Sequence, residues 1–142
     1  MNQRIVNGGF IVHQGKFLIV KRADNDSFLP GIWEIPGGKL EPGEDPLDGA
    51  RREVKEEAGL DVELVSPISI WTYGDYSGGT QFIQIDYLCK IIGNPEVKLS
   101  EEHSDFAWIT YDELDKYEIS PEMRKEILAF KTNLLVENLL GK

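Results

Sequence analysis

Cysteine is nearly absent from this chain, because Cys89 is the only one among 142 residues. A single thiol excludes an internal disulfide. Cys89 lies among apolar, strand-like neighbours, and neither a helix start nor a basic cluster lies beside it to lower its pKa. We therefore expect a small buried apolar residue and not a reactive thiol.

Positive charge is scarce, and long apolar runs are missing. The chain has 15 lysines and arginines against 25 acidic residues, for a formal net charge of -10. This charge repels phosphate polyanions, which argues against nucleic-acid polymers as partners and requires cations for any small phosphorylated ligand. No apolar run approaches the roughly 20 residues of a membrane span, and residues 1–10 lack the features of a signal peptide. We expect a cytoplasmic protein without a membrane partner.

What is present predicts one domain spanning residues 1–142, because 41% hydrophobic residues suffice for a single core at this length. Segments rich in Ile, Val, Phe and Leu predict strands at residues 4–12, 16–22, 62–73, 81–92 and 106–109. The first two, separated by three residues, predict a hairpin. Residues 36–44 are rich in glycine and proline and predict one extended loop.

An amphipathic helix is expected directly after that loop. Asp45 is placed to cap it, Pro46 suits its first turn, and Gly59 suits a left-handed stop. One narrow apolar stripe for docking on a sheet consists of Leu47, Ala50, Val54 and Ala58.

The C-terminal part of the chain predicts two helical segments. Thr110 and Glu113 form a capping box for a short turn, and Ser120-Pro121 opens a longer helix that runs toward Gly141. One apolar stripe of the longer helix comprises Met123, Ile127, Phe130 and Leu134, and a second comprises Leu128, Leu135 and Leu139. The helix packs on the domain's own sheet or forms a dimer interface, so both a monomer and a homodimer stay open.

Acidic residues gather on the first helix. Glu53, Glu56 and Glu57 span about 100° of its circumference beside the apolar stripe. Carboxylates about 6 Å apart repel each other by roughly 2 to 3 kcal/mol at an effective dielectric constant near 20. A divalent cation would relieve this repulsion, and ligands that are all oxygen atoms favour Mg²⁺ or Mn²⁺ over Zn²⁺.

Residues 38–60 resemble the Nudix box at every specified position of that motif. The pattern is Gly38, five residues, Glu44, seven residues, and then Arg-Glu-Val-Lys-Glu-Glu-Ala-Gly-Leu to Leu60. A chance match in such a chain is on the order of one in ten million. Residues 33–39 before the box, and Trp108-Ile109 with residues 112–114 after it, extend the resemblance to the small MutT-like branch.

The resemblance implies an α/β fold in which helices sandwich a mixed β-sheet, with a catalytic loop-helix-loop. It implies that Glu53 and Glu57 are principal metal ligands, and that Glu56 is a third ligand or the base that activates water. The backbone carbonyl of Gly37 or Gly38 would complete the site.

The remaining roles implied by the resemblance concern the loops. Arg52 would orient the catalytic carboxylates, with Glu44 as its partner. Glu102 would be a further metal ligand from a distant loop, although Glu101 and His103 compete for that role.

The residues also offer candidates for substrate binding. Arg22 and Lys39 lie near the hairpin end and the glycine loop, where they would contact phosphate. A base could stack on one of several aromatic residues that equally suit a core: Trp33, Trp71, Tyr73, Tyr76 and Phe82.

The expected reaction is Mg²⁺-dependent hydrolysis of a diphosphate bond in a nucleoside diphosphate linked to another group. Nucleoside triphosphates, including oxidised ones, are the favoured substrates and would be cut to monophosphate and pyrophosphate. ADP-ribose or nucleotide sugars and dinucleoside polyphosphates are the alternatives. A non-catalytic nucleotide-binding regulator would typically have lost box acids, whereas this chain keeps all four.

Overall fold

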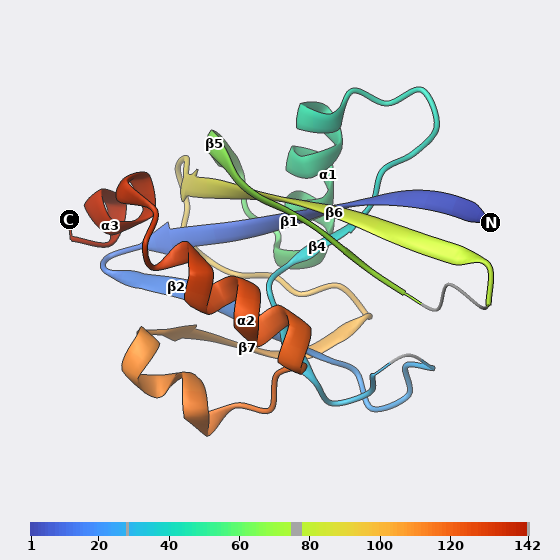
Figure 1. The fold of residues 1–142 in the computed structure, drawn as a ribbon. Coiled ribbons are helices and arrows are strands. Elements are labelled where there is room, and N and C mark those ends of the chain that lie inside the picture. The colour runs from blue at the N-terminus through green and yellow to red at the C-terminus, as the bar shows by residue number, and fades with distance from the viewer. Residues whose placement is uncertain (28, 75–77, 142) are drawn as a thin grey trace.

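The protein is a mixed β-sheet with helices on both faces (Figure 1). This computed structural model describes residues 1–27, 29–74 and 78–141. The strands are β1 (Asn2–His13), β2 (Lys16–Arg22), β3 (Trp33–Glu34), β4 (Gly37–Lys39), β5 (Val62–Tyr73), β6 (Thr80–Ile91) and β7 (His103–Ile109). The helices are α1 (Pro46–Ala58), the 3-10 helix η1 (Tyr111–Lys116), α2 (Pro121–Phe130) and α3 (Leu134–Leu140).

Strand β1 organises the sheet, whose main order is β3-β2-β1-β6-β5. It runs parallel to β6 along most of its length and forms the predicted antiparallel hairpin with β2. Strand β4 pairs with residues 6–8 in the middle of β1, and β7 pairs with β2. The mixed sheet confirms the expected fold class.

Two apolar cores lie on the two faces of the sheet. Successive residues of β1 alternate between them: Phe10 belongs to the core under α2 and α3, and Ile11 to the core under α1. Strands buried on both faces carry continuous apolar runs, which is why residues 10–12 and 17–20 are apolar throughout. Figure 1 shows α1 and α2 on opposite sides of the sheet.

Helix α1 begins and ends where its sequence signals predicted. The Asp45 side chain accepts hydrogen bonds from the amides of Leu47 and Asp48, and Gly59 ends the helix in a left-handed conformation with φ 71°. Ala50, Val54 and Ala58 are buried as expected, but Leu47 is 44% exposed. The stripe fails at Leu47 because it lies in the first turn, beyond the buried part of the helix.

The segment 36–44 is not one continuous loop, because β4 lies within it. Gly37 and Gly38 pair with Gly8 and Asn7 of β1. Glycine permits this close approach: a Cβ atom at Gly37 would lie 2.0 Å from the Asn7 carbonyl oxygen. The glycines therefore fix the segment against β1 as a short strand.

The long C-terminal helix predicted from Ser120 toward Gly141 is broken into α2 and α3. Asn133 adopts an extended backbone between them, and its side chain caps α3 by accepting from Leu135 and Val136. The break changes the direction of the apolar face, so Leu134 is 71% exposed although the continuous stripe placed it in the core.

The starts of η1 and β7 can also be compared with the sequence predictions. The capping box of Thr110 and Glu113 is confirmed at the start of η1. Strand β7 begins at His103, three residues before the predicted start at Phe106. Among the described residues, no helix has the length and apolar character needed to cross a membrane.

Gly59→Ala should lower the free energy of unfolding by more than Gly93→Ala, as measured by chemical denaturation. Both glycines have positive φ, 71° and 79°, and an L-residue there costs about 1 to 2 kcal/mol. Only at Gly59 would the new Cβ also meet Lys98, whose Cβ lies 2.7 Å away, whereas nothing lies within 4 Å at Gly93. Equal losses in the two variants would contradict this explanation of the motif glycine.

Candidate active site

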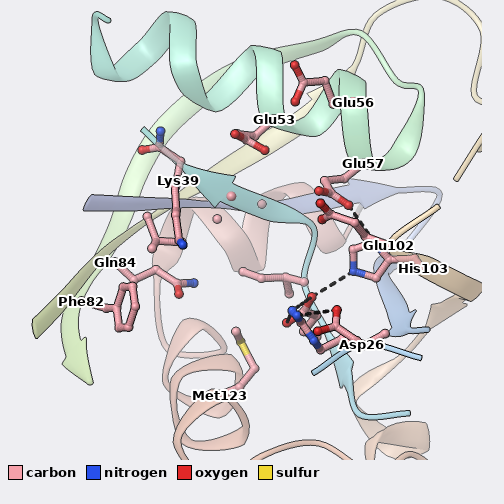
Figure 2. Close-up of a pocket in the computed structure, with 18 of the residues that line it drawn as sticks. Asp26, Lys39, Glu53, Glu56, Glu57, Phe82, Gln84, Glu102, His103 and Met123 are labelled. Atoms are coloured by element: carbon pink, nitrogen blue, oxygen red, sulfur yellow. Dashed lines mark hydrogen bonds and ion pairs between the residues drawn. The ribbon is translucent and has the colours of Figure 1, made fainter. Parts of the chain in front are cut away.

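One cleft of about 810 Å³ collects most of the residues singled out in the sequence. It opens between β1, β4, α1 and β6 and the turn before β7. Figure 2 shows four carboxylates, Glu53, Glu56, Glu57 and Glu102, on one side, which we call the acidic end. Phe82, Gln84 and Met123 lie on the other side, which we call the neutral end.

Helix α1 supplies three of the acidic side chains, and these differ in their exposure to solvent. Glu53 and Glu57 are only 7% and 5% exposed, because they lie four residues apart on the flank that faces the sheet. The side chain of Glu56 is 57% exposed. Two buried carboxylates and one accessible carboxylate therefore share the same helical turns.

Strand β4 brings its backbone directly against Glu53. A Cβ atom at Gly38 would lie 2.1 Å from Oε2 of Glu53, so only glycine leaves room for this carboxylate. Burial raises the pKa of Glu53. The strand places the backbone at Gly38, one of the two residues whose carbonyls were expected at a metal site, beside a principal candidate ligand.

Arg52 joins the loop before α1 to the acids on the helix. Its guanidinium donates two hydrogen bonds to Glu44, at 2.6 and 2.8 Å, and further bonds to Glu53 at 2.9 Å and Glu56 at 3.1 Å. The bond from Arg52 lowers the pKa of Glu44 to about 2. A planar, bidentate contact of this kind fixes both orientation and charge.

His103 holds Glu57 from the opposite side. Its ring nitrogens lie 2.7 Å from Oε2 of Glu57 and 2.9 Å from Oε2 of Glu34. The Nδ1 atom is poorly aligned with the Glu57 oxygen, so that contact is mainly a charge pair. Burial opposes the charged form, yet the two carboxylates raise the pKa of His103 to about 9.

Glu102 is the acid of its loop that reaches the cleft. A hydrogen bond with Glu57 raises the pKa of Glu102 to about 7. Its neighbour Glu101 is exposed and does not line the cleft. Two neighbouring carboxylates repel each other when both are ionised, and a cation between them would relieve that repulsion.

The two cationic residues expected to contact phosphate also line the cleft. Arg22 is already paired with Asp26 at 2.7 Å and with Glu34 at 3.1 Å. Lys39 extends into the cleft with its ammonium group 5.9 Å from the centre of the Phe82 ring. Lys39 therefore lies closer than the acids to the neutral end.

The aromatic candidates divide between core and cleft. Trp33 packs edge-on against Tyr117 at the side of the core, with ring centres 4.9 Å apart. Tyr73 and Phe82 stack with ring centres 5.3 Å apart, and both line the cleft. Tyr76 lies outside the described residues.

The donor chemistry of the acidic end suits a hard divalent cation, which prefers carboxylate and carbonyl oxygens. In the described part of the chain, no three acidic, histidine or cysteine side chains stand close enough to enclose an ion without moving. Instead, Arg52 and His103 balance the carboxylates. Asn7, which is 1% exposed and lines the same cleft, has both side-chain polar atoms unpaired within the described residues.

The family of the chain follows from this site and from a direct comparison. A protein-family model described as the NUDIX domain matches residues 3–130, which include the whole site. The chain belongs to the Nudix hydrolase family. The chain is therefore an enzyme of this hydrolase family, and the glycine loop and acidic helix lie within the matched residues.

Individual Nudix relatives resemble the chain over nearly its whole length. Nucleoside triphosphatase NudI of Escherichia fergusonii is 34% identical over 137 residues, covering 89% of this chain and 96% of that protein. The MutT protein structure from Methanosarcina mazei Go1 has a TM-score of 0.78 at 26% identity and covers 91% of this chain and 93% of that one. A MutT Nudix hydrolase from Burkholderia pseudomallei has the same TM-score at 25% identity and covers 90% and 98%.

Sequence reasoning missed several polar residues of the cleft. Asn7 and Gln84 are buried and line the cleft, and buried Asp86 contacts Gln84; each lies next to apolar residues in its strand. A charged or amide residue inside such a strand was the available signal, because a buried polar group needs a partner and seldom serves packing alone.

Gly38→Ala should lower kcat/KM at least tenfold while leaving the far-ultraviolet circular dichroism spectrum unchanged. The new methyl group would occupy the space of the Glu53 carboxylate, which must then move away from the backbone at Gly38. Gly43→Ala in the same loop is a demanding control, because its φ of 81° adds backbone strain while nothing lies within 4 Å of its added Cβ. A Gly38→Ala enzyme as active as the control would show that the position of Glu53 is unimportant.

Proposed function

We propose that this Nudix hydrolase uses Mg²⁺ or Mn²⁺ to cut nucleoside triphosphates into a nucleoside monophosphate and pyrophosphate. The observation that carries the proposal is the division of one cleft into an acidic end and a neutral end. A polyphosphate needs cations in a protein with a net charge of -10, whereas a nucleoside needs aromatic and amide groups. Each end suits one half of a nucleotide.

The acidic end would hold the cation through Glu53, Glu57 and Glu102, with a backbone carbonyl of Gly37 or Gly38. These oxygens lie on α1, on β4 and in the turn before β7, and all of these residues line the one cleft. When bound, a divalent cation neutralises phosphate oxygens and lowers the pKa of water. The chain's own residues supply the orientation.

Arg52 would tie the loop to the helix through Glu44 and orient Glu53 through its hydrogen bond of 2.9 Å. Glu56 is the accessible acid, which suits the acceptance of a proton from water, and its contact with Arg52 at 3.1 Å orients the carboxylate. Lys39 is placed between the two ends to contact phosphate. His103 holds Glu57 in place from behind.

The choice of triphosphates is supported by the relative that is 34% identical, which is named a nucleoside triphosphatase. ADP-ribose, nucleotide sugars and dinucleoside polyphosphates are the competing substrates. Their second nucleoside or sugar would have to lie beyond the acidic end, where Glu56 is open to solvent.

Turnover should require a divalent cation. We expect the purified enzyme to convert at least one nucleoside triphosphate to monophosphate and pyrophosphate with Mg²⁺, and to lose this activity in excess chelator and regain it with added Mg²⁺ or Mn²⁺. Mass spectrometry of the products identifies the bond that is cut. Turnover in chelator, or release of orthophosphate alone, would contradict the proposal. Hydrolysis of ADP-ribose or a dinucleoside polyphosphate, without hydrolysis of triphosphates, would contradict the proposed substrate class and favour the competing one.

Glu53→Gln and Glu57→Gln should each lower kcat by at least a hundredfold, because each removes a charged oxygen ligand and keeps the shape of the side chain. Glu101→Gln is the matched control, since Glu101 is exposed and outside the cleft. Steady-state kinetics at saturating Mg²⁺ and thermal unfolding of each variant provide the measurement. A folded Glu57→Gln enzyme with the kcat of the control would remove Glu57 from the site.

A further inference from the structure

Gln84 at the neutral end is hydrogen-bonded to a fully buried carboxylate, Asp86, which does not itself line the cleft and which the proposed reaction does not use. Asp86 on β6 is 0% exposed. Its Oδ2 atom accepts a hydrogen bond of 2.8 Å from the indole nitrogen of Trp71, and its Oδ1 atom accepts one of 2.7 Å from the side-chain amide of Gln84. A buried charge is costly unless it is hydrogen-bonded in this way, so the group calls for an explanation beyond packing.

The surrounding backbone is shaped to admit this arrangement. Gly8 of β1 lies against it: an added Cβ would be 2.1 Å from Oδ1 of Asp86 and 2.8 Å from Nε2 of Gln84. Trp71 and Gln84 are direct cross-strand partners on β5 and β6, which fixes their approach. Burial raises the pKa of Asp86 to about 6, while the two donated hydrogen bonds, one to each carboxylate oxygen, favour its ionised form.

The chemistry of the three side chains fixes how the Gln84 amide is oriented. An indole nitrogen can only donate, and an ionised carboxylate can only accept. Gln84 must therefore turn its NH₂ group toward Asp86, which directs its carbonyl oxygen away from the carboxylate. Figure 2 shows the end of the Gln84 side chain extending into the cleft near Phe82.

The walls beside this amide suit a flat ring. Phe82 precedes Gln84 by two residues on β6, so both side chains lie on the same face of the sheet, and Phe82 stacks on Tyr73. Met123 of α2 lines the same end of the cleft. Aromatic rings and a polarisable thioether are good surfaces for a heteroaromatic base.

We propose that Gln84 reads the nucleobase, its fixed carbonyl oxygen accepting a hydrogen bond from an N–H group on the edge of the base. Asp86 and Trp71 are positioning residues that hold the amide in this orientation. This inference rests on the proposed nucleotide hydrolysis. It adds which residue contacts the base, and that this residue accepts the hydrogen bond while the base donates it.

The Asp86→Asn substitution should reverse the orientation of the Gln84 amide. Because Trp71 still donates, the introduced amide must give its oxygen to Trp71 and turn its NH₂ group toward Gln84. Gln84 then has to present its oxygen to the introduced NH₂ group and its own NH₂ group to the cleft. The variant keeps every side-chain shape and changes only the polarity offered to the base.

The experiment compares the best of the common nucleoside triphosphates with derivatives that lack one edge N–H at a time. An imino N–H is replaced by C–H, or an amino group by hydrogen, so that size is nearly kept. For the wild-type enzyme we expect one of these losses to raise KM about tenfold with little change in kcat, as for one lost hydrogen bond remote from the reacting atoms. For Gln84→Ala, the KM values of the parent nucleotide and of this derivative should differ by no more than twofold. Gln81→Ala changes a residue of the same strand outside the cleft and should keep the tenfold difference in KM.

Asp86→Asn should also lose the tenfold ratio while remaining folded by circular dichroism, which a merely structural role would not produce. The inference would be overturned if the wild-type enzyme had the same KM for the parent nucleotide and every derivative, or if Asp86→Asn kept the tenfold difference in KM. Neither result would contradict nucleotide hydrolysis itself. Absence of hydrolysis of every common triphosphate by the wild type would instead contradict the proposed function. Should Asp86→Asn fail to fold, the Gln84→Ala ratio alone decides.

Discussion

The crowding of four carboxylates at one end of a cleft is the constraint on which the rest of the site depends. Glu53 and Glu57 are nearly buried, Glu102 shares a hydrogen bond with Glu57, and Glu56 lies one turn away from Arg52. Such a cluster is costly unless cations balance it. Arg52 and His103 supply part of that balance, and the same side chains set the direction in which each carboxylate points.

The fold gives this cluster a rigid setting. Helix α1 is fixed at both ends, by the Asp45 cap and by Gly59, and β4 is held against β1 through paired glycines. The acids therefore lie on regular elements, with only Glu102 coming from a turn. A site built on regular elements holds its geometry better than one built on loops alone.

Local signals in the sequence predicted most of the helices and strands. They could not predict the contacts between segments that are distant in the sequence. The caps of α1 and the hairpin of β1 and β2 depend on neighbouring residues and were predicted, although β1 runs from Asn2 to His13 and so extends beyond the predicted residues 4–12. The break at Asn133 was missed, because an apolar repeat continues across it. The box motif located Glu53, Glu56 and Glu57. The contact of His103 with Glu57 joins β7 to α1, and that of Trp71 with Asp86 joins β5 to β6, and periodicity reveals neither.

The central claim is that these carboxylates bind a divalent cation, and binding can be measured without catalysis. Electron paramagnetic resonance of Mn²⁺ titrated into the protein without nucleotide counts the bound ions directly. We expect saturable binding by the wild-type protein, competition by Mg²⁺, and at least a tenfold weaker dissociation constant for a folded Glu57→Gln variant. Mn²⁺ binding of equal strength in the two proteins, or no saturable binding by the wild type, would contradict the claim.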